Sequence, residues 1–556
     1  MSETTRNPGR TWGIPEQFLP KILTVLREGY RLSDLRADAI AGLTVAIVAL
    51  PLSMAIAIAS GVGPERGLFT AIVGGFLVSA FGGSRFQVGG PAGAFIVLIS
   101  ACVAATGLEG LILATFLSGF LLMAAGALRL GTYIKFIPYP VTVGFTAGIA
   151  VIIFASQIKD LFGLSLNVSE PGAVFAKIGV LWAARGSVTP AAFGLALATI
   201  ATILSLRRLR PHWPGMLIAV AVTGALVATF DLQVATIGTR FGQLPRILPS
   251  PALPGLGMDA VLAALPWALS FALLGAIESL LSAVVADGMT GRQHRSNAEL
   301  VGQGVANIGS ALFGGFCVTG TIARTATNVR AGSHGPVSGM LHAVFVLAFM
   351  LIAAPLAAYI PLAALAGVLA VVAWNMAEKA ELWALIRSSR GDALVVITTF
   401  LLVVLRDLTE GIVVGFALGG LVFIKRMSDA TEVRPAPVEG RYDPAEATDQ
   451  AMVVYHLRGP FFFGAAAQLG SVLDRIADRP RAFVVDFTDV PFIDSSGARS
   501  FEMLARKCAR QGGQLFLTST NADVRRVLLA QGVREPHVRY LPDVAGVEEI
   551  LRATAP

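Results

Sequence analysis

The sequence predicts an α-helical membrane protein that ends in a small α/β domain. Three observations lead to this prediction. Only 14% of the 556 residues are charged and 54% are hydrophobic, whereas a soluble globular chain has about 25% charged residues. Apolar segments long enough to cross a bilayer follow one another from residue 38 to residue 425. From residue 450 onward, short apolar runs alternate instead with amphipathic segments.

Residues 1–36 form the first element, a polar and basic segment that contains Pro8, Pro15 and Pro20. We interpret it as a cytoplasmic arm with two alternative structures. Either part of it forms an amphipathic helix on the membrane surface, or the whole segment is a loosely ordered, solvated tail. These residues are too polar to be a cleavable signal before the first apolar segment.

The transmembrane domain is predicted over residues 37–427, with about 14 full or partial spans by hydropathy. The predicted spans lie near 38–60, 65–82, 91–105, 108–128, 138–156, 189–206, 213–230, 259–286, 298–312, 320–331, 335–357, 361–376, 392–406 and 410–425. Basic residues gather in alternate loops, for example at Arg207, Arg208 and Arg210. Such loops mark the cytoplasmic side of the inner membrane, so an even number of spans places both termini there.

Composition and motifs exclude several other classes of protein. The net charge of +7 comes from these loops and not from basic clusters with interleaved aromatic residues, so we expect no nucleic-acid partner. Cys102, Cys317 and Cys508 are far apart and lack metal-binding or redox spacing. The sequence has no phosphate-binding loop, zinc-protease motif or dinucleotide-binding glycine motif. We therefore expect neither an enzyme nor a bound cofactor or metal.

The transmembrane domain contains an internal repeat, with repeat one at about 37–232 and repeat two at about 258–427. In both, a Phe-Gly-Gly sequence is followed by a few extended residues and then by a glycine that precedes a short helix. Each half holds about seven spans, an odd number, so the second half enters the membrane from the opposite face. Interrupted helices at matching positions mark transporter sites, and we expect their N-termini near Pro91 and Thr321 to face each other.

Residues 313–332 are the centre of the predicted site, because their helix can begin only near Thr321. A helix that begins within the bilayer leaves its first amide N–H groups without backbone partners, and these amides bind anions. Arg324 lies on the first turn, and an arginine at this depth usually marks a ligand pathway. The predicted substrate-binding residues are Gly90, Pro91, Ala92, Gly320, Thr321, Ile322, Arg324 and Thr325. The alternative is helix packing through Thr321, Thr325 and Asn328, with Arg324 paired permanently with an acid.

Glu278 is a carboxylate deep within the predicted span 259–286, and Ser282 lies one turn further on the same face. An acid within a membrane is by default a proton or cation carrier. We expect Glu278, with Ser282, to couple a proton to the movement of the anion. The alternative is a fixed salt bridge between Glu278 and Arg324.

Residues 428–449 are polar and rich in proline, which predicts a linker. Residues 450–556 then alternate predicted strands with amphipathic helices at 465–477, 497–511 and 521–531. This alternation is typical of a small α/β domain, which is cytoplasmic if the loop charges give the orientation.

The sequence Asp494-Ser495-Ser496-Gly497 lies between a predicted strand and a predicted helix of this domain. One interpretation is a turn that caps the helix. The other is a phosphorylation site at Ser495.

Several of these segments together resemble the sulfate permease (SulP) family of anion transporters with a C-terminal STAS domain, over nearly the whole chain. The segments are Ile40–Val45, Leu50–Ala55, Gly89–Pro91, Gly275–Leu281, Gly320–Gly332 and Asp494–Gly497. Within the family, IARTATNVRAG and GAIESLLSAVVADGMTG are most similar to bacterial proton-coupled C4-dicarboxylate carriers of succinate and fumarate. The chain departs from the family at Pro64–Phe69, where two tyrosines of the frequent P-x-Y-G-L-Y pattern are absent.

The resemblance implies a core domain and a gate domain, each drawn from both repeats and moving as an elevator, and it implies a homodimer. In sodium–bicarbonate members the positions matching Glu278, Ser282, Gly320 and Ile322 bind sodium, so sodium is a rival coupling ion. In STAS proteins of the anti-sigma-antagonist type the serine matching Ser495 is phosphorylated. The resemblance also suggests a cytoplasmic regulator of the STAS domain, such as an acyl carrier protein.

The expected function is therefore secondary active, proton-coupled uptake of C4-dicarboxylates by an elevator mechanism, with membrane lipid around the spans. Sulfate transport and sodium-coupled bicarbonate transport are the alternatives for the substrate. A passive anion channel on the same scaffold is a further alternative. So is a membrane-anchored signalling module in which the cytoplasmic domain is the working part.

Overall fold

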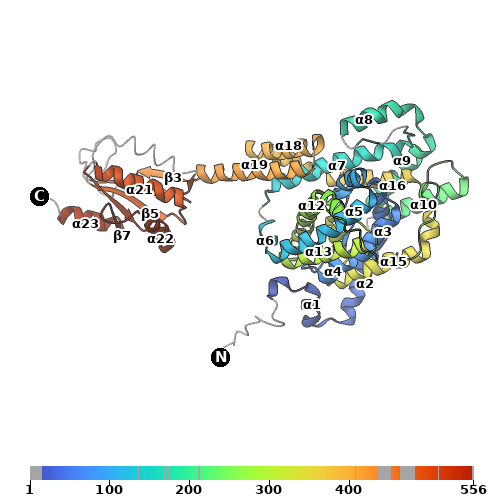
Figure 1. Cartoon of the computed structure of the whole chain (residues 1–556), viewed down its shortest axis with the longest axis horizontal. Helices are drawn as coiled ribbons and strands as arrows, with labels where there is room; N and C mark the ends of the chain where they lie inside the picture. Colours follow the sequence, from blue (N-terminus) through green and yellow to red (C-terminus); the bar gives the residue numbers. More distant parts are fainter. Residues whose placement is uncertain are drawn as a thin grey trace. The chain divides into compact units, whose positions relative to one another are not determined.

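The structure is a computed structural model of the chain. It describes residues 15–134, 137–166, 170–171, 174–210, 213–406, 408–435, 452–463, 482–510 and 512–553. The chain divides into two compact units, Met1–Phe416 and Ala417–Pro556. Figure 1 shows that the first unit is helical and that the second contains a β-sheet.

The longest predicted spans appear as helices. Among the described residues, eight helical segments are long and apolar enough to cross a membrane. They are α2 (Leu32–Ala59), η3 with α5 (Gly93–Phe95 and Ile96–Ala127), α7 (Tyr139–Phe162), α9 (Pro190–Leu209), α12 (Met258–Thr290), α15 (Val337–Ala357), α16 with α17 (Leu362–Met376 and Lys379–Ser388) and α19 (Leu408–Asp429).

The other predicted spans are shorter or interrupted helices. They are α3 (Pro64–Phe69) with the π-helical turn η2 (Thr70–Gly74) and α4 (Gly75–Phe81), then α10 (Gly215–Phe230), α13 (Ser296–Leu312), α14 (Ile322–Arg330) and α18 (Arg390–Leu405). Short helices in the connections are α6 (Gly131–Ile134), α8 (Val174–Ala183), η4 (Ala184–Ser187) and α11 (Ile237–Phe241). Helix α5 contains two predicted spans that meet at Gly107, whose φ of 71° is readily adopted only by glycine.

Helices of the two repeats approach one another through small residues. Helices α5 and α13 meet at Gly119 and Gly304. A Cβ on Gly119 would lie 2.6 Å from the Gly304 carbonyl oxygen, and a Cβ on Gly304 would lie 2.4 Å from the Gly119 carbonyl oxygen. Helix α2 approaches α15 similarly, because a Cβ on Gly42 would lie 2.5 Å from the Ser338 carbonyl oxygen. Close contact through glycine is typical of membrane helices. Large apolar side chains such as Ile352 remain exposed on the outside of the bundle.

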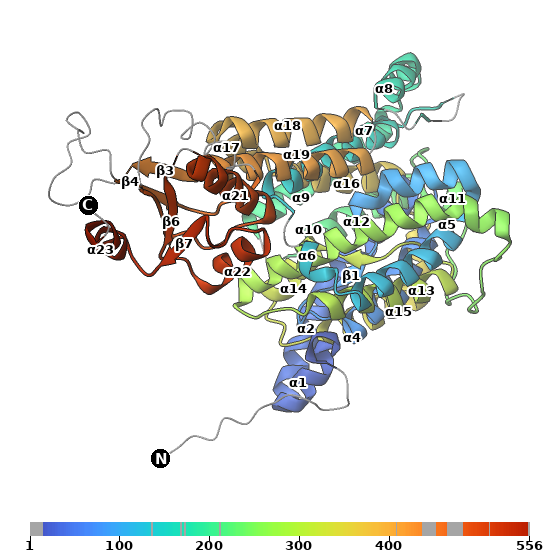
Figure 2. The ribbon, with the colours of Figure 1, turned by 60° about the vertical axis from the view of Figure 1, so that its left-hand side comes forward.

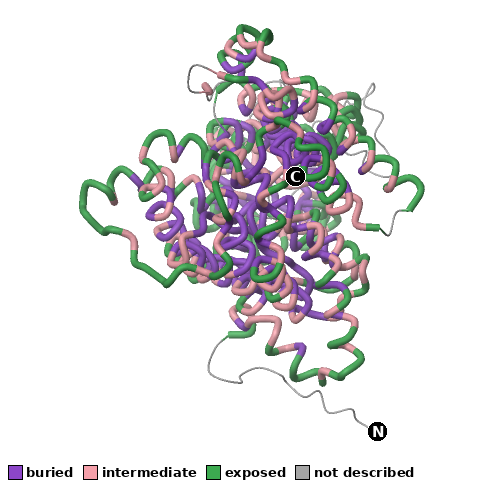
Figure 3. Tube along the Cα trace, turned by 90° about the vertical axis from the view of Figure 1, so that its right-hand side faces the viewer, coloured by how far each residue is buried: buried purple, intermediate pink, exposed green. Residues whose placement is uncertain are grey.

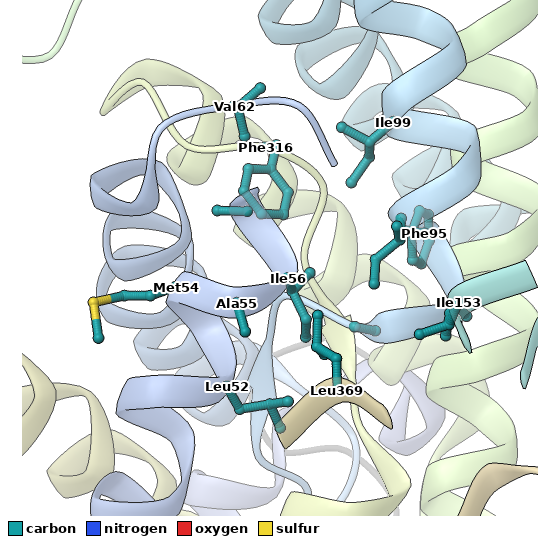
Figure 4. Close-up of a cluster of buried hydrophobic side chains, with 14 of the residues drawn as sticks. Leu52, Met54, Ala55, Ile56, Val62, Phe95, Ile99, Ile153, Phe316 and Leu369 are labelled. Carbon is teal, nitrogen blue, oxygen red and sulfur yellow. The ribbon is translucent and has the colours of Figure 1, made fainter. Parts of the chain in front are cut away.

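One apolar cluster connects helices of both repeats, and Figure 4 shows part of it. Ile56 of α2 and Phe95, just before α5, belong to repeat one together with Ile153 of α7. Phe316 and Leu369 belong to repeat two. Figure 3 shows that buried residues occupy the middle of the helices, whereas exposed residues follow the outer loops. The cluster therefore holds the beginning of α5 in the interior of the first unit.

Residues 16–30 pack against the helical bundle of the first unit. They form η1 (Glu16–Phe18) and α1 (Lys21–Gly29), and the Val25 side chain is buried. The Lys21 amide donates to the Gly82 carbonyl oxygen at 3.0 Å, and the Arg295 guanidinium donates to the Leu19 carbonyl oxygen at 3.0 Å. The alternative of a loosely ordered tail is therefore wrong for this stretch, while residues 1–14 lie outside the described residues.

The second unit contains a five-stranded sheet of order β3-β4-β5-β6-β7, in which only the β3–β4 pair is antiparallel. Its elements are β3 (Glu432–Pro435), β4 (Met452–Arg458), β5 (Ala482–Asp489), α21 (Ser495–Arg510), β6 (Gln514–Thr518), α22 (Ala522–Ala530), β7 (Val538–Leu541) and α23 (Ala545–Ala553). Helices α21 and α22 cover one face of the sheet and α23 covers the other. Strand β3 comes from the stretch predicted as a linker, and the helix predicted at 465–477 lies outside the described residues.

Candidate functional site

The two interrupted segments pair with each other inside the first unit. Strand β1 (Gly89–Gly90) of repeat one and strand β2 (Thr319–Gly320) of repeat two form an antiparallel pair in which every residue is buried. Gly89 lies opposite Gly320 and Gly90 lies opposite Thr319. A helical turn follows each strand, η3 after β1 and α14 after β2. The pairing therefore brings two helix N-termini to the same place within the membrane domain.

The N-terminus of α14 has amides without side-chain caps. Thr321 occupies the N-cap position in an extended conformation, and its side chain makes no capping hydrogen bond. Its own amide donates to the Val88 carbonyl oxygen at 3.2 Å, and the helical hydrogen bonds begin with the Thr325 amide. The amides of the first turn, from Ile322 to Arg324, are thus the donors that a helix N-terminus offers to an anion.

Arg324 lies on this first turn and points toward repeat one. The side chain is only 2% exposed. Its guanidinium donates to the Gly89 carbonyl oxygen at 3.4 Å, to the Pro91 carbonyl oxygen at 3.3 Å and to the Ser53 hydroxyl of α2 at 3.0 Å. All three acceptors are uncharged, so they do not neutralise the guanidinium.

No ion pair joins Arg324 to an acid among the described residues, and its Nε atom has no hydrogen-bond partner there. The alternative of a fixed Glu278–Arg324 salt bridge is therefore not what the structure contains. A buried charge without a counter-ion costs several kcal/mol, which a bound anion would offset. This is the electrostatic feature that distinguishes the site from ordinary helix packing.

Two glycines of the β1–β2 pair lie against the ends of polar side chains. A Cβ on Gly90 would lie 1.7 Å from Arg324 Nη1, and a Cβ on Gly320 would lie 1.8 Å from Gln87 Nε2. A Cβ at either position would therefore have to displace the end of the Arg324 or Gln87 side chain. The glycines of the interrupted segments therefore make room for polar side chains to reach the β1–β2 pair.

The polar residues of α14 have two different roles. The Thr325 hydroxyl accepts a hydrogen bond from the Val88 amide at 3.2 Å and another from Ser282 at 2.9 Å. The Asn328 amide donates to the Phe86 carbonyl oxygen at 2.8 Å. Thr325 and Asn328 thus hold the two repeats together, as the packing alternative expects, while Arg324 on the flank of the stripe faces Gly89 to Pro91.

Glu278 is buried on α12, one helical turn before Ser282. The part of the chain that the structure describes provides no hydrogen bond or ion pair to its carboxylate. Ser282, in contrast, already donates to Thr325. A buried carboxylate without a fixed partner is free to exchange a proton, whereas one held by several donors stays ionised.

A polar ridge on α13 was missed in the sequence. Glu299, Gln303 and Asn307 follow one another at intervals of four residues and are all buried. The Glu299 carboxylate accepts four hydrogen bonds, from the Gly83 amide at 2.8 Å, the Ser84 amide at 2.9 Å, Gln87 at 2.7 Å and Ser279 at 3.1 Å. The i, i+4, i+8 spacing of large polar residues within a predicted span was the signal that could have revealed this ridge.

The other two residues of the ridge bind the second interrupted segment. Asn307 donates to the Val318 carbonyl oxygen at 3.1 Å and accepts from the Val318 amide at 3.0 Å. Gln303 also donates to the Val318 carbonyl oxygen. The ridge thus fixes the chain before β1 through Glu299 and the chain before β2 through Asn307, so it positions both strands of the pair.

In the second unit, Asp494 caps α21 in the way that one interpretation of its turn predicts. Its carboxylate accepts from the Gly497 amide at 2.7 Å and from the Phe463 amide at 3.2 Å. Ser495 is the first residue of the helix and is exposed. Its phosphorylation stays a prediction.

A helical membrane domain whose two repeats contribute interrupted helices to one buried site defines a membrane transporter of the inverted-repeat class. Comparison with known families makes the assignment specific. Residues 35–399 match the model of the sulfate permease family, and residues 444–536 match that of the STAS domain. The chain therefore belongs to the sulfate permease family, which confirms the predicted transporter with a C-terminal STAS domain and excludes an enzyme.

Individual relatives agree with this assignment. The chain is 40% identical over 508 residues to the putative sulfate transporter YvdB of Bacillus subtilis, covering 91% of this chain and 95% of the relative. It is 30% identical over 522 residues to the bicarbonate transporter BicA of a Picosynechococcus species, covering 89% and 90%. These names refer to sulfate and bicarbonate, so they lend no support to a special closeness to C4-dicarboxylate carriers.

Solved structures support the fold. Murine Slc26a9, an anion transporter in the inward-facing state, superposes with a TM-score of 0.84 at 18% identity and covers 99% of this chain and 97% of its own. The transmembrane domain of a cyanobacterial BicA superposes with a TM-score of 0.61 at 31% identity, covering 70% of this chain and 98% of its own. The predicted fold class, a helical membrane protein with a STAS domain, is thus confirmed.

Proposed function

We propose that this chain is a secondary active transporter that carries a small anion bound between the helix N-termini that follow β1 and β2. The observation that carries the proposal is the buried Arg324 guanidinium, which has only neutral acceptors around it. The amides from Ile322 to Arg324 add donors from one side. The backbone of Gly90, Pro91 and Ala92 closes the other side of the site. Thr325 acts through the hydrogen bonds that hold the segments together.

Coupling to a proton is the second part of the proposal. Glu278 is buried within the membrane and has no fixed partner among the described residues, which suits a group that loads and unloads a proton during transport. Sodium is the alternative coupling ion, with Glu278, Ser282, Gly320 and Ile322 as its ligands. The Ser282 hydroxyl donates its proton to Thr325, so its oxygen lone pairs remain available to sodium, and the sodium dependence of uptake distinguishes the two ions.

The substrate is proposed at the level of a small oxyanion. C4-dicarboxylates follow from the resemblance of the α14 and α12 sequences, whereas sulfate and bicarbonate follow from the names of the relatives. All three carry the charge that Arg324 requires. An elevator movement, a homodimer in the inner membrane with both termini in the cytoplasm, and an acyl carrier protein at the STAS domain are further parts of this proposal.

The experiment is uptake into proteoliposomes of the full-length protein with fumarate, sulfate and bicarbonate, each with and without sodium. With an outside-acidic pH gradient, we expect one of these anions to accumulate above its equilibrium level and to saturate. Saturable uptake driven only by sodium would replace the proton in the proposal. Uptake that never exceeds the electrochemical equilibrium would instead identify a passive channel.

A signalling module is tested by removing the cytoplasmic domain. If the second unit is the working part, deletion of residues 440–556 leaves no function to measure. We expect the truncated protein to retain saturable anion uptake at a reduced rate.

A further inference from the structure

A cavity of about 430 Å³ opens beside the first turns of α5. Its walls come from the C-terminal ends of α2, α7 and α18, from α5 and from the segment that contains α8. Along α5 the wall runs from Ile96 to Ala104, about 12 Å at the helical rise per residue. Ile96 follows directly after η3, so one end of this wall begins where repeat one enters the candidate site.

The cavity lies at the end of the first unit that is opposite to α1. Figures 1 and 2 both show α8 and α1 on opposite sides of the helical unit. The segment with α1 contacts Arg295, which lies with Arg292 in a basic loop between the predicted spans 259–286 and 298–312. Basic loops mark the cytoplasmic side. Under the proposed orientation, the cavity therefore opens to the outside.

The lining of the cavity carries more positive than negative charge. Four basic side chains line it, Lys159, Lys177, Arg240 and Arg406, and two acidic ones, Asp160 and Glu170. Both acids are already paired, because Lys177 lies 2.9 Å from Glu170 and Arg240 lies 3.5 Å from Asp160. Arg406 lies 3.3 Å from Glu410, which is not part of the lining. Lys159 has no ion pair among the described residues.

The two ion pairs also fix the shape of the cavity wall. Lys177 lies on α8 and its side chain is only 9% exposed, so the pair with Glu170 is part of a packed wall and not a loose surface contact. Arg240 lies on α11 and reaches Asp160 at the end of α7. Segments outside the main bundle thus bring their charges to the cavity by defined contacts.

We infer that this cavity is the external access chamber of the anion pathway, with Lys159 and Arg240 as the residues that attract the anion and Asp160 as the residue that limits this attraction. The inference rests on the proposed function. A positively charged, low-dielectric cavity raises the local concentration of an anion and speeds its arrival. These residues therefore affect the rate at which the anion reaches the protein, and not the strength of its binding beside Arg324.

The location of the chamber is tested without transport. In separate variants of the full-length protein, Ser100→Cys and Ala104→Cys place a thiol in the α5 wall. In oriented membrane vesicles, both thiols react with an impermeant, positively charged thiol reagent added to the outside. Thr132→Cys, an exposed position in the connection that follows α5, reacts only after permeabilisation, and the wild type, whose Cys102 is buried, does not react. Reaction of Thr132→Cys but not of Ala104→Cys from the outside would overturn the inference.

The charge of the chamber is tested by variants with opposite expected effects. At low ionic strength, Lys159→Gln is expected to raise KM about three- to tenfold with little change in kcat. The reason is that a cavity lined by charge of one sign raises the association rate of an oppositely charged substrate by about 10-fold or more. Asp160→Asn is expected to lower KM, because it leaves Arg240 without a counter-ion. Both effects shrink as salt is added.

A matched control is Arg185→Gln. Arg185 lies on η4, which follows α8, but outside the cavity lining. We expect its KM to be that of the wild type. Equal KM changes for Lys159→Gln and Arg185→Gln would overturn the inference that the charge of this cavity attracts the anion. A rise in KM for Asp160→Asn would overturn it too. Absence of saturable uptake by the wild type would contradict the proposed function instead, and the thiol experiment would still test the location of the chamber.

Discussion

Gly90 and Arg324 approach each other so closely that a Cβ on Gly90 would lie 1.7 Å from Arg324 Nη1. The two residues come from different repeats, and the β1–β2 pair places them together. Gly90 thus gives the guanidinium its space beside the backbone of repeat one. The glycine of the interrupted segment, which is visible in the sequence, thus lies directly beside the positive charge that would hold the proposed anion.

The first prediction concerns this contact. Gly90→Ala is expected to reduce saturable anion uptake at least about tenfold, because the methyl group displaces Arg324 and tenfold corresponds to only about 1.4 kcal/mol. The measurement is initial uptake into proteoliposomes, with thermal unfolding in detergent as a check on folding. Gly194→Ala is the control, since a Cβ there meets no atom within 4 Å. Equal uptake by the two variants would contradict the role of Gly90.

The second prediction concerns the ridge on α13. Glu299→Gln is expected to lower the free energy of unfolding by roughly 2–4 kcal/mol, because each carboxylate oxygen accepts two hydrogen bonds and the amide nitrogen that replaces one oxygen leaves its two donors unsatisfied, either Gly83 and Ser84 or Gln87 and Ser279. The midpoint of thermal unfolding in detergent reports this change. Glu109→Gln on the exposed side of α5 is the control. A Glu299→Gln midpoint equal to that of the control would show that the network is not needed for stability.

The third prediction concerns coupling. Glu278→Gln cannot release a proton, so we expect uptake that no longer responds to an imposed pH gradient, or no uptake at all. Uptake at several external pH values, with and without the gradient, measures this effect. Substrate affinity, measured by isothermal titration, is expected to survive. A variant with the pH dependence of the wild type would remove the proton role from Glu278.

The fourth prediction concerns the second unit. Burial of Asp486 opposes its ionisation, but hydrogen bonds from Ser519, Thr488, Thr518 and His456 outweigh burial and lower its pKa below the usual range. A depressed carboxyl pKa stabilises the folded state at pH values above the unfolded pKa of about 3.9, and this contribution is lost as the pH falls through the folded pKa.

Asp486→Asn is therefore expected to speed hydrogen exchange in β5 and β6 at neutral pH, measured by mass spectrometry on the full-length protein. The difference from the wild type is expected to begin to narrow below about pH 4, where Asp486 becomes protonated in the unfolded state, and to close only as the pH falls through the lower pKa of the folded state. A difference that stays constant over this range would show that the effect of Asn does not come from the lost charge.

The spans and the interrupted segments could be predicted from the sequence because both depend on local signals. Apolar length revealed the helices, and a glycine break before Arg324 revealed the interrupted segment. The sequence suggested Thr325 as a ligand of the anion, which stays a prediction, but it did not reveal that the Thr325 hydroxyl accepts from the Val88 amide of the other repeat. Which neighbour a polar residue meets within a membrane is set by the packing of distant helices, which spacing alone does not reveal.

Other features escaped prediction for related reasons. Glu299 receives three of its four donors from residues more than 200 positions away in the chain, Gly83, Ser84 and Gln87. Strand β3 lies in a polar, proline-rich stretch and becomes a strand only by pairing with β4. The sequence also gives no local sign that α1 packs against Gly82 and Arg295. Each feature is created by tertiary contacts and not by local propensity.

The most direct test of the central claim is saturable uptake by Arg324→Ala and Arg324→Lys in proteoliposomes, with thermal unfolding as the check that both variants are folded. We expect Arg324→Ala to lose saturable uptake, because removing one partner of a buried charge contact costs roughly 2–5 kcal/mol. Arg324→Lys, which retains the charge without the planar fork, is expected to transport with a raised KM. Folded Arg324→Ala protein with the KM and rate of the wild type would contradict the claim that this arginine holds the anion.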